Sequence, residues 1–128
     1  AGVDGIIIPK DRSVSVNSTV MKTSSGAATN MKICMVTNLV QTIKYLKDKG
    51  YYITATDMDG ENYTDISYTG STCIVIGNEG KGVAHLVKKS SDYIASIPLL
   101  GKINSLNASV AAGILIYEVV RQRNINGL

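Results

Sequence analysis

Short β-favouring runs alternate with segments of helical periodicity along the whole chain. The runs are rich in isoleucine, valine and threonine, as is typical of strands that are buried on both faces of a parallel sheet. We predict such strands at Val3–Ile8, Ile33–Val36, Tyr51–Thr56, Thr72–Ile76 and Tyr93–Ile97.

The segments between these runs carry helical patterns. The clearest begins at Asn38, where Leu39, Ile43 and Leu46 recur at helical spacing, and Gly50 supplies a C-terminal cap. Further helices are predicted at Thr19–Thr29, Gly82–Ser90 and Leu106–Arg123. Strands that alternate with helices over the whole length predict an α/β domain with a mainly parallel sheet.

The last predicted helix is apolar on nearly every side until Glu118. A single buried face cannot account for this pattern, because a surface helix keeps one side polar. We expect the sheet to cover one face and a partner subunit the other, which favours a homodimer. A central helix within a monomer is the alternative.

Length and composition indicate one globular domain. A chain of 128 residues, of which 45% are hydrophobic and 18% charged, can bury a core without disulfides or metal ions. The longest uninterrupted apolar run, Val110–Tyr117, is too short to span a bilayer, so we expect no membrane segment. The chain opens at Ala1 without a methionine, and we expect the true start to lie upstream.

The cysteines and the charge suit an intracellular protein. Cys34 and Cys73 lie in separate apolar runs without C-x-x-C spacing, so we predict buried free thiols in a reducing, cytoplasmic setting. The net charge of +3 suits an RNA partner without predicting one. Asp57, Asp59 and Glu61 resemble the start of a calcium loop but lack its glycine and closing glutamate, so we expect no metal site.

The strand ending at Ile76 runs directly into a glycine-rich turn with glycines at positions 77, 80 and 82. Glycines let the backbone approach a ligand closely, and ligands of open α/β sheets bind at the carboxyl ends of strands. The order G-x-x-G-x-G is neither a dinucleotide fingerprint nor a phosphate loop, so a simple turn is the alternative. Glu79 either orients a cationic group or is a solvated acid.

A second polar cluster follows the strand that ends at Ile97. Four small polar residues lie around the start of the last predicted helix. One helix cap needs fewer than four. They are Asn104, Ser105, Asn107 and Ser109. With Leu99, Leu100 and Leu106 as apolar walls, the cluster would suit an adenosine.

These two segments resemble a known family. I-V-I-G-N-E-G-K-G at 74–82 is similar to motif 2, and I-P-L-L-G-K-I-N-S-L-N-A-S-V-A at 97–111 to motif 3, of the SpoU (TrmH-like) RNA ribose 2′-O-methyltransferases of the SPOUT class. Gly2–Arg12 and Ser24–Ala28 resemble the family's second strand and its following helix. The likeness covers essentially the whole chain and is closest to bacterial enzymes that methylate a guanosine of large-subunit ribosomal RNA.

The resemblance implies a fold, a cofactor and site residues. The fold is a trefoil-knotted α/β domain over 1–128 with helices on both faces of the sheet, truncated at its amino-terminal end by one strand and one helix. It implies a homodimer that binds S-adenosylmethionine through Gly77, Ile97, Leu99, Gly101 and Leu106. It also places Glu79, Ser105 and Asn107 in the catalytic centre. Candidate contacts to the RNA backbone are Lys10, Arg12, Lys22 and Lys81.

One part of the family pattern is missing. The family usually assigns proton removal to an arginine in an N-x-x-x-x-R segment of motif 1, and this sequence contains no such segment. A non-catalytic module that binds S-adenosylmethionine or RNA is therefore an alternative to the methyltransferase. A transfer RNA 2′-O-methyltransferase and a nucleotide-binding regulatory domain outside the family are further alternatives.

Overall fold

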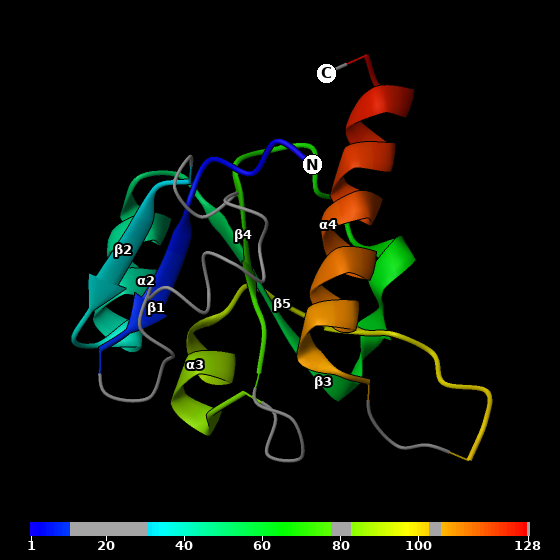
Figure 1. Ribbon diagram of the computed structural model, residues 1–128, viewed down its shortest axis with the longest axis horizontal. Coiled ribbons are helices and arrows are strands. Elements are labelled where there is room, and N and C mark those ends of the chain that lie inside the picture. The colour runs from blue at the N-terminus through cyan, green and yellow to red at the C-terminus, as the bar shows by residue number, and fades with distance from the viewer. Residues whose placement is uncertain (11–30, 78–82, 103–105, 128) are drawn as a thin grey trace. The chain divides into compact units, whose positions relative to one another are not determined.

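The computed structural model describes residues 1–10, 31–77, 83–102 and 106–127 (Figure 1). Contacts divide the chain into two compact units, Gly2–Thr42 and Ile43–Leu128, the second of which includes Ala1. The helix predicted at 19–29 lies outside the described residues.

The first unit contains a parallel pair of strands. β1 (Ile6–Pro9) and β2 (Ile33–Val36) pair from Ile6 opposite Ile33 to Pro9 opposite Val36. Ile7 and Cys34 are opposite each other on one face of this pair, and both are exposed. The expectation that Cys34 is buried is therefore wrong, because its face of the two-stranded sheet is open.

α2 (Leu39–Asp48) begins in the first unit and ends in the second, and both of its ends follow the predicted signals. Asn38 Oδ1 accepts a hydrogen bond from the Gln41 amide at 3.1 Å, which satisfies one free donor of the first turn. Gly50 has a φ of 91°, where L-residues with side chains are strained, and its amide bonds to the Lys47 carbonyl.

The second unit is built on a three-stranded parallel sheet with the order β4–β3–β5. Its strands are β3 (Tyr52–Asn62), β4 (Thr72–Val75) and β5 (Tyr93–Ser96). Thr54 is opposite both Ile74 and Tyr93, so these three side chains share one face. α3 (His85–Ser90) and α4 (Ala108–Ile125) lie on opposite sides of this sheet (Figure 1).

The prediction of a parallel α/β fold with helices is confirmed, although the described strands form two sheets. β3 is longer than predicted because its pairing with β5 shifts register between Thr56 and Glu61 and then resumes. Gly60 lies in this irregular segment against the backbone of Ile94, where a Cβ atom would collide with the Ile94 carbonyl. Glycine is therefore required at this close approach.

The core of the second unit lies between the sheet and α4. Leu115 of α4 is fully buried with Ile66, Tyr68 and Ala95. Half-buried side chains from the sheet pack around this cluster, including Ile74, Tyr93 and Ile97. The apolar character of the first half of α4 is thus partly explained by the sheet.

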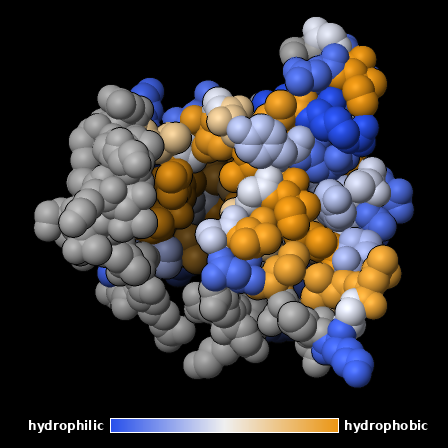
Figure 2. Space-filling model, turned by 45° about the vertical axis from the view of Figure 1, so that its right-hand side comes forward, coloured by the Kyte–Doolittle hydropathy of each residue, from blue (hydrophilic) through white to orange (hydrophobic). Residues whose placement is uncertain are grey.

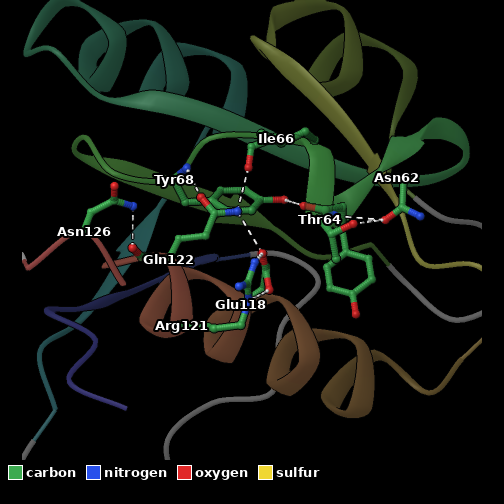
Figure 3. Close-up of polar contacts among 9 residues, drawn as sticks. Asn62, Thr64, Ile66, Tyr68, Glu118, Arg121, Gln122 and Asn126 are labelled. Carbon is green, nitrogen blue, oxygen red and sulfur yellow. Dashed lines mark hydrogen bonds and ion pairs between the residues drawn. The ribbon is translucent and has the colours of Figure 1, made fainter. Parts of the chain in front are cut away.

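A polar network joins the second half of α4 to the segment before β4 (Figure 3). The buried Glu118 carboxylate accepts hydrogen bonds from Arg121 Nε at 2.7 Å, Arg121 Nη2 at 2.8 Å and Gln122 Nε2 at 2.8 Å. Gln122 Nε2 also donates to the Ile66 carbonyl at 2.8 Å, and its Oε1 accepts from the Tyr68 amide at 2.9 Å. The pKa of Glu118 is lowered, chiefly by the hydrogen bond from Arg121, although burial acts in the opposite direction.

Replacing the fully buried leucine tests this core. We expect Leu115→Ala to lower the free energy of unfolding by about 3 kcal/mol, through lost transfer energy and the cavity that remains. The control is the same substitution at Leu86, which is 63% exposed and should cost less than about 0.5 kcal/mol. Urea unfolding measures both, and equal effects would contradict the described packing.

The lowered pKa of Glu118 predicts a pH-dependent contribution to stability. A carboxyl group whose pKa falls on folding stabilises the native state above its unfolded pKa, here near 4.5, and loses this contribution as the pH falls through the folded value. We expect Glu118→Gln to be less stable than the parent by about 1 to 2 kcal/mol at pH 7. The difference should shrink below about pH 4.5 in urea titrations. A difference that stays constant with pH would show that the charge of Glu118 does not matter.

Candidate functional site

The three strands of the second unit end at one edge of the sheet. They are parallel, so Thr56 on β3, Gly77 after β4 and Ile97 after β5 all lie at the carboxyl edge. β3 lies between the other two strands, so Gly77 and Ile97 flank it near Thr56. Ligands of open α/β sheets bind at such an edge, and this edge is the candidate site.

The segment that follows β5 could present main-chain groups and apolar side chains to a ligand. The Ile97 side chain packs against the core around Leu115, so its main-chain groups are what it can present to a ligand. Leu99 and Leu106 are half-buried, whereas Gly101 is exposed and open space surrounds the position of its absent Cβ. This combination fits the predicted adenosine site, in which apolar walls accompany a few main-chain hydrogen bonds.

Asn107 is the N-cap of α4. Its Oδ1 accepts hydrogen bonds from the Ser109 amide at 2.9 Å and from the Ser109 hydroxyl at 2.5 Å. The capping role that the sequence left open for these two residues is therefore confirmed. The Asn107 side chain is exposed, and the cap holds it in one orientation.

Part of the predicted site lies outside the part of the chain that the structure describes. The five residues concerned are Arg12, Lys22, Glu79, Lys81 and Ser105. Lys10 is described and exposed directly after β1 in the first unit. Of the predicted set, the strand register places Gly77 and Ile97 at the same edge of the sheet.

An ion pair at the same edge was not predicted from the sequence. The Lys88 ammonium on α3 donates to the Asp57 carboxylate, which directly follows Thr56. This hydrogen bond is the largest cause of the lowered pKa of Asp57, and the Met58 amide adds a second at 2.6 Å. The partners are 31 positions apart in sequence, too far for any local pattern to reveal them.

Cys73 on β4 is half-buried and free, and its burial raises the pKa of the thiol.

Within the described ranges, no group of three or more histidine, cysteine, aspartate or glutamate residues could hold a metal ion. No helix among these residues is long and apolar enough to cross a membrane.

A separate hollow of about 440 Å³ lies between the β3–β4 connection and the end of α4. Its lining is mostly polar and comes from the segment before β4 and the end of α4. It includes Thr64, Asp65, Ser67, Arg121 and Asn126. None of its lining residues is among the predicted site residues, so the hollow is distinct from the candidate site.

The family model of the SpoU rRNA Methylase family matches residues 1–117. The chain belongs to the SpoU rRNA methylase family. The family predicted from the sequence is thereby confirmed.

Relatives and solved structures agree with this assignment. A Staphylococcus saprophyticus protein, named as a member of the TrmH family of tRNA/rRNA methyltransferases, is 48% identical over 99% of this chain and 51% of its own length. The crystal structure of the SpoU methyltransferase AviRb from Streptomyces viridochromogenes, in complex with AdoMet, is 27% identical with a TM-score of 0.86, over 95% of this chain and 51% of that one. The A. aeolicus TrmH/SpoU tRNA modifying enzyme is 31% identical with a TM-score of 0.83, over 95% and 64%.

This SpoU family chain spans about half the length of the curated relatives that it matches. The family assignment therefore applies to the chain itself, whereas the activity of a whole relative does not transfer with it.

Proposed function

We propose that this chain is the cofactor-binding part of an S-adenosylmethionine-dependent RNA ribose 2′-O-methyltransferase. The observation that carries the proposal is the carboxyl edge at which Gly77 and Ile97 flank β3 near Thr56. Family membership and the likeness to AdoMet-bound AviRb support the choice of ligand.

The residues of this edge fit the proposed cofactor. Gly77 and Ile97 would hold it mainly through main-chain groups, and half-buried Leu99 and Leu106 would cover its apolar ring. Gly101 leaves room beside them. When bound, S-adenosylmethionine supplies a methyl group that its sulfonium has already activated.

The protein's own residues then have two tasks. They align the ribose hydroxyl for in-line attack, which contributes most of the rate, and they help to remove its proton. We assign Asn107 to alignment because its cap to Ser109 fixes its orientation at an exposed position. Glu79 and Ser105 are proposed for the same centre from the motifs alone.

The proposed substrate is RNA, with a guanosine of large-subunit ribosomal RNA as the first choice and a transfer RNA as the second. Lys10, Arg12, Lys22 and Lys81 are the proposed contacts to its phosphates, because phosphate binding requires cations but little geometry. A trefoil knot and a cytoplasmic location belong to the same proposal.

A non-catalytic binding module is the second candidate, because the N-x-x-x-x-R segment is absent from these 128 residues. Transfer of a labelled methyl group to RNA separates the two candidates. Binding without transfer, in a longer protein that also contains no such segment, would favour the module.

We also propose a homodimer that uses the outer face of α4. Val110 and Tyr117 on this face are 50% and 61% exposed, and open space surrounds the position of the absent Cβ of Gly113 between them. Figure 2 shows apolar side chains gathered over the first half of the helix. A second copy would bury them, whereas exposed glycine in a helix otherwise only costs stability.

Cofactor binding is tested by calorimetric titration with S-adenosylmethionine. We expect roughly micromolar affinity, and its loss in Leu106→Arg, because a charged side chain would enter the apolar wall. The matched control is Leu86→Arg at an exposed position of α3, which should bind as the parent does. A folded parent that does not bind would refute the proposed function.

The dimer is tested by sedimentation velocity. We expect the parent to have twice the mass of a single chain and Tyr117→Glu to shift toward the monomer, because a carboxylate would be buried at the interface. Tyr45 on α2 is also 61% exposed, so Tyr45→Glu controls for the loss of an exposed tyrosine and should leave the mass unchanged. A monomeric parent would contradict this proposal.

A further inference from the structure

The ends of the three strands are tied to one another by side-chain hydrogen bonds. The Thr56 hydroxyl donates to the Val75 carbonyl of β4 at 3.3 Å, and the Ser96 hydroxyl of β5 donates to the Met58 carbonyl at 3.2 Å. Asp57 lies between these two contacts and accepts from the Met58 amide. The Asp57 carboxylate therefore occupies a defined position at the centre of the carboxyl edge.

Lys88 connects this centre to α3. The Asp57 and Lys88 side chains are 23% and 31% exposed, so the pair is partly withdrawn from solvent. A charge-assisted hydrogen bond in such a position is stronger and more directional than a fully solvated one. α3 begins at His85, shortly after Gly77 in the chain. The pair therefore fixes the position of the first described helix after β4.

We propose that Asp57 and Lys88 are positioning residues for the cofactor site, which they serve by holding α3 in place against the carboxyl edge beside Gly77. This inference rests on the proposed function. Neither residue needs to touch the cofactor. Their effect is to preorganise the main-chain groups that do, because a binding site loses affinity when the structure that supports it is free to move.

The second unit contains a matched pair at the opposite edge of the sheet. Lys47 on α2 lies 3.6 Å from Asp92, which precedes β5, and their side chains are 40% and 27% exposed. This pair also joins a helix to the sheet and has comparable exposure, but it is at the amino end of the strands. Lys47 Nζ also donates to the Ser90 carbonyl at the end of α3 at 3.2 Å, so Lys47→Met controls for the loss of a lysine contact to α3 away from the carboxyl edge.

The test compares dissociation constants for S-adenosylmethionine in the 128-residue chain and its variants. We expect Lys88→Met to weaken binding about fivefold, as for the loss of a partly exposed ion pair, and Lys88→Arg to restore most of the affinity. Lys47→Met should bind as the parent does. Thermal midpoints of all variants should remain within a few degrees of the parent.

A charge-reversed variant keeps the test decisive if Lys88→Met is poorly folded. Asp57→Lys combined with Lys88→Asp should bind more tightly than either single reversal. Parent-like affinity in Lys88→Met, an equal loss in Lys47→Met, or no rescue in the double variant would each overturn the inference. A parent that does not bind would instead overturn the proposed function, and this inference with it.

Discussion

The parallel register of β4, β3 and β5 is the constraint on which the candidate site depends. Thr54 is paired with Ile74 on one side and with Tyr93 on the other, so β4 and β5 end on either side of β3 near Thr56. Two segments that are 20 positions apart in sequence, at Gly77 and Ile97, are thereby brought to either side of one strand. Without this register the glycine turn and the polar cluster would be two unrelated loops.

α4 depends on the same sheet. Leu115 anchors its middle in the apolar cluster, and the Glu118–Gln122 network holds its second half against Ile66 and Tyr68. The start of the helix is capped by Asn107, directly after the half-buried Leu106. The helix thus extends from the candidate site to a buried polar anchor, so changes at Leu115 or Glu118 should reach the site only through helix stability.

Local patterns in the sequence predicted most of the elements, since each depends on neighbouring residues. β2 has the predicted limits, and α2 follows its Asn38 and Gly50 signals. Features that depend on contacts between residues far apart in sequence could not be predicted from local patterns. The exposure of Cys34 depends on what covers a sheet face, and the Asp57–Lys88 pair depends on where α3 packs. Residue types indicated a ligand turn at Gly77 and an adenosine site near Leu99 and Leu106, but the identity of the cofactor was predicted only through the family's motifs.

The most direct test of the account is where S-adenosylhomocysteine binds, measured by amide chemical-shift changes in the isotopically labelled chain. The account predicts that the largest changes fall at the carboxyl edge, at Thr56, Gly77, Ile97 and Leu106, with little change around the polar hollow at Thr64 and Asn126. Changes concentrated at the hollow, or none at saturating ligand, would contradict it.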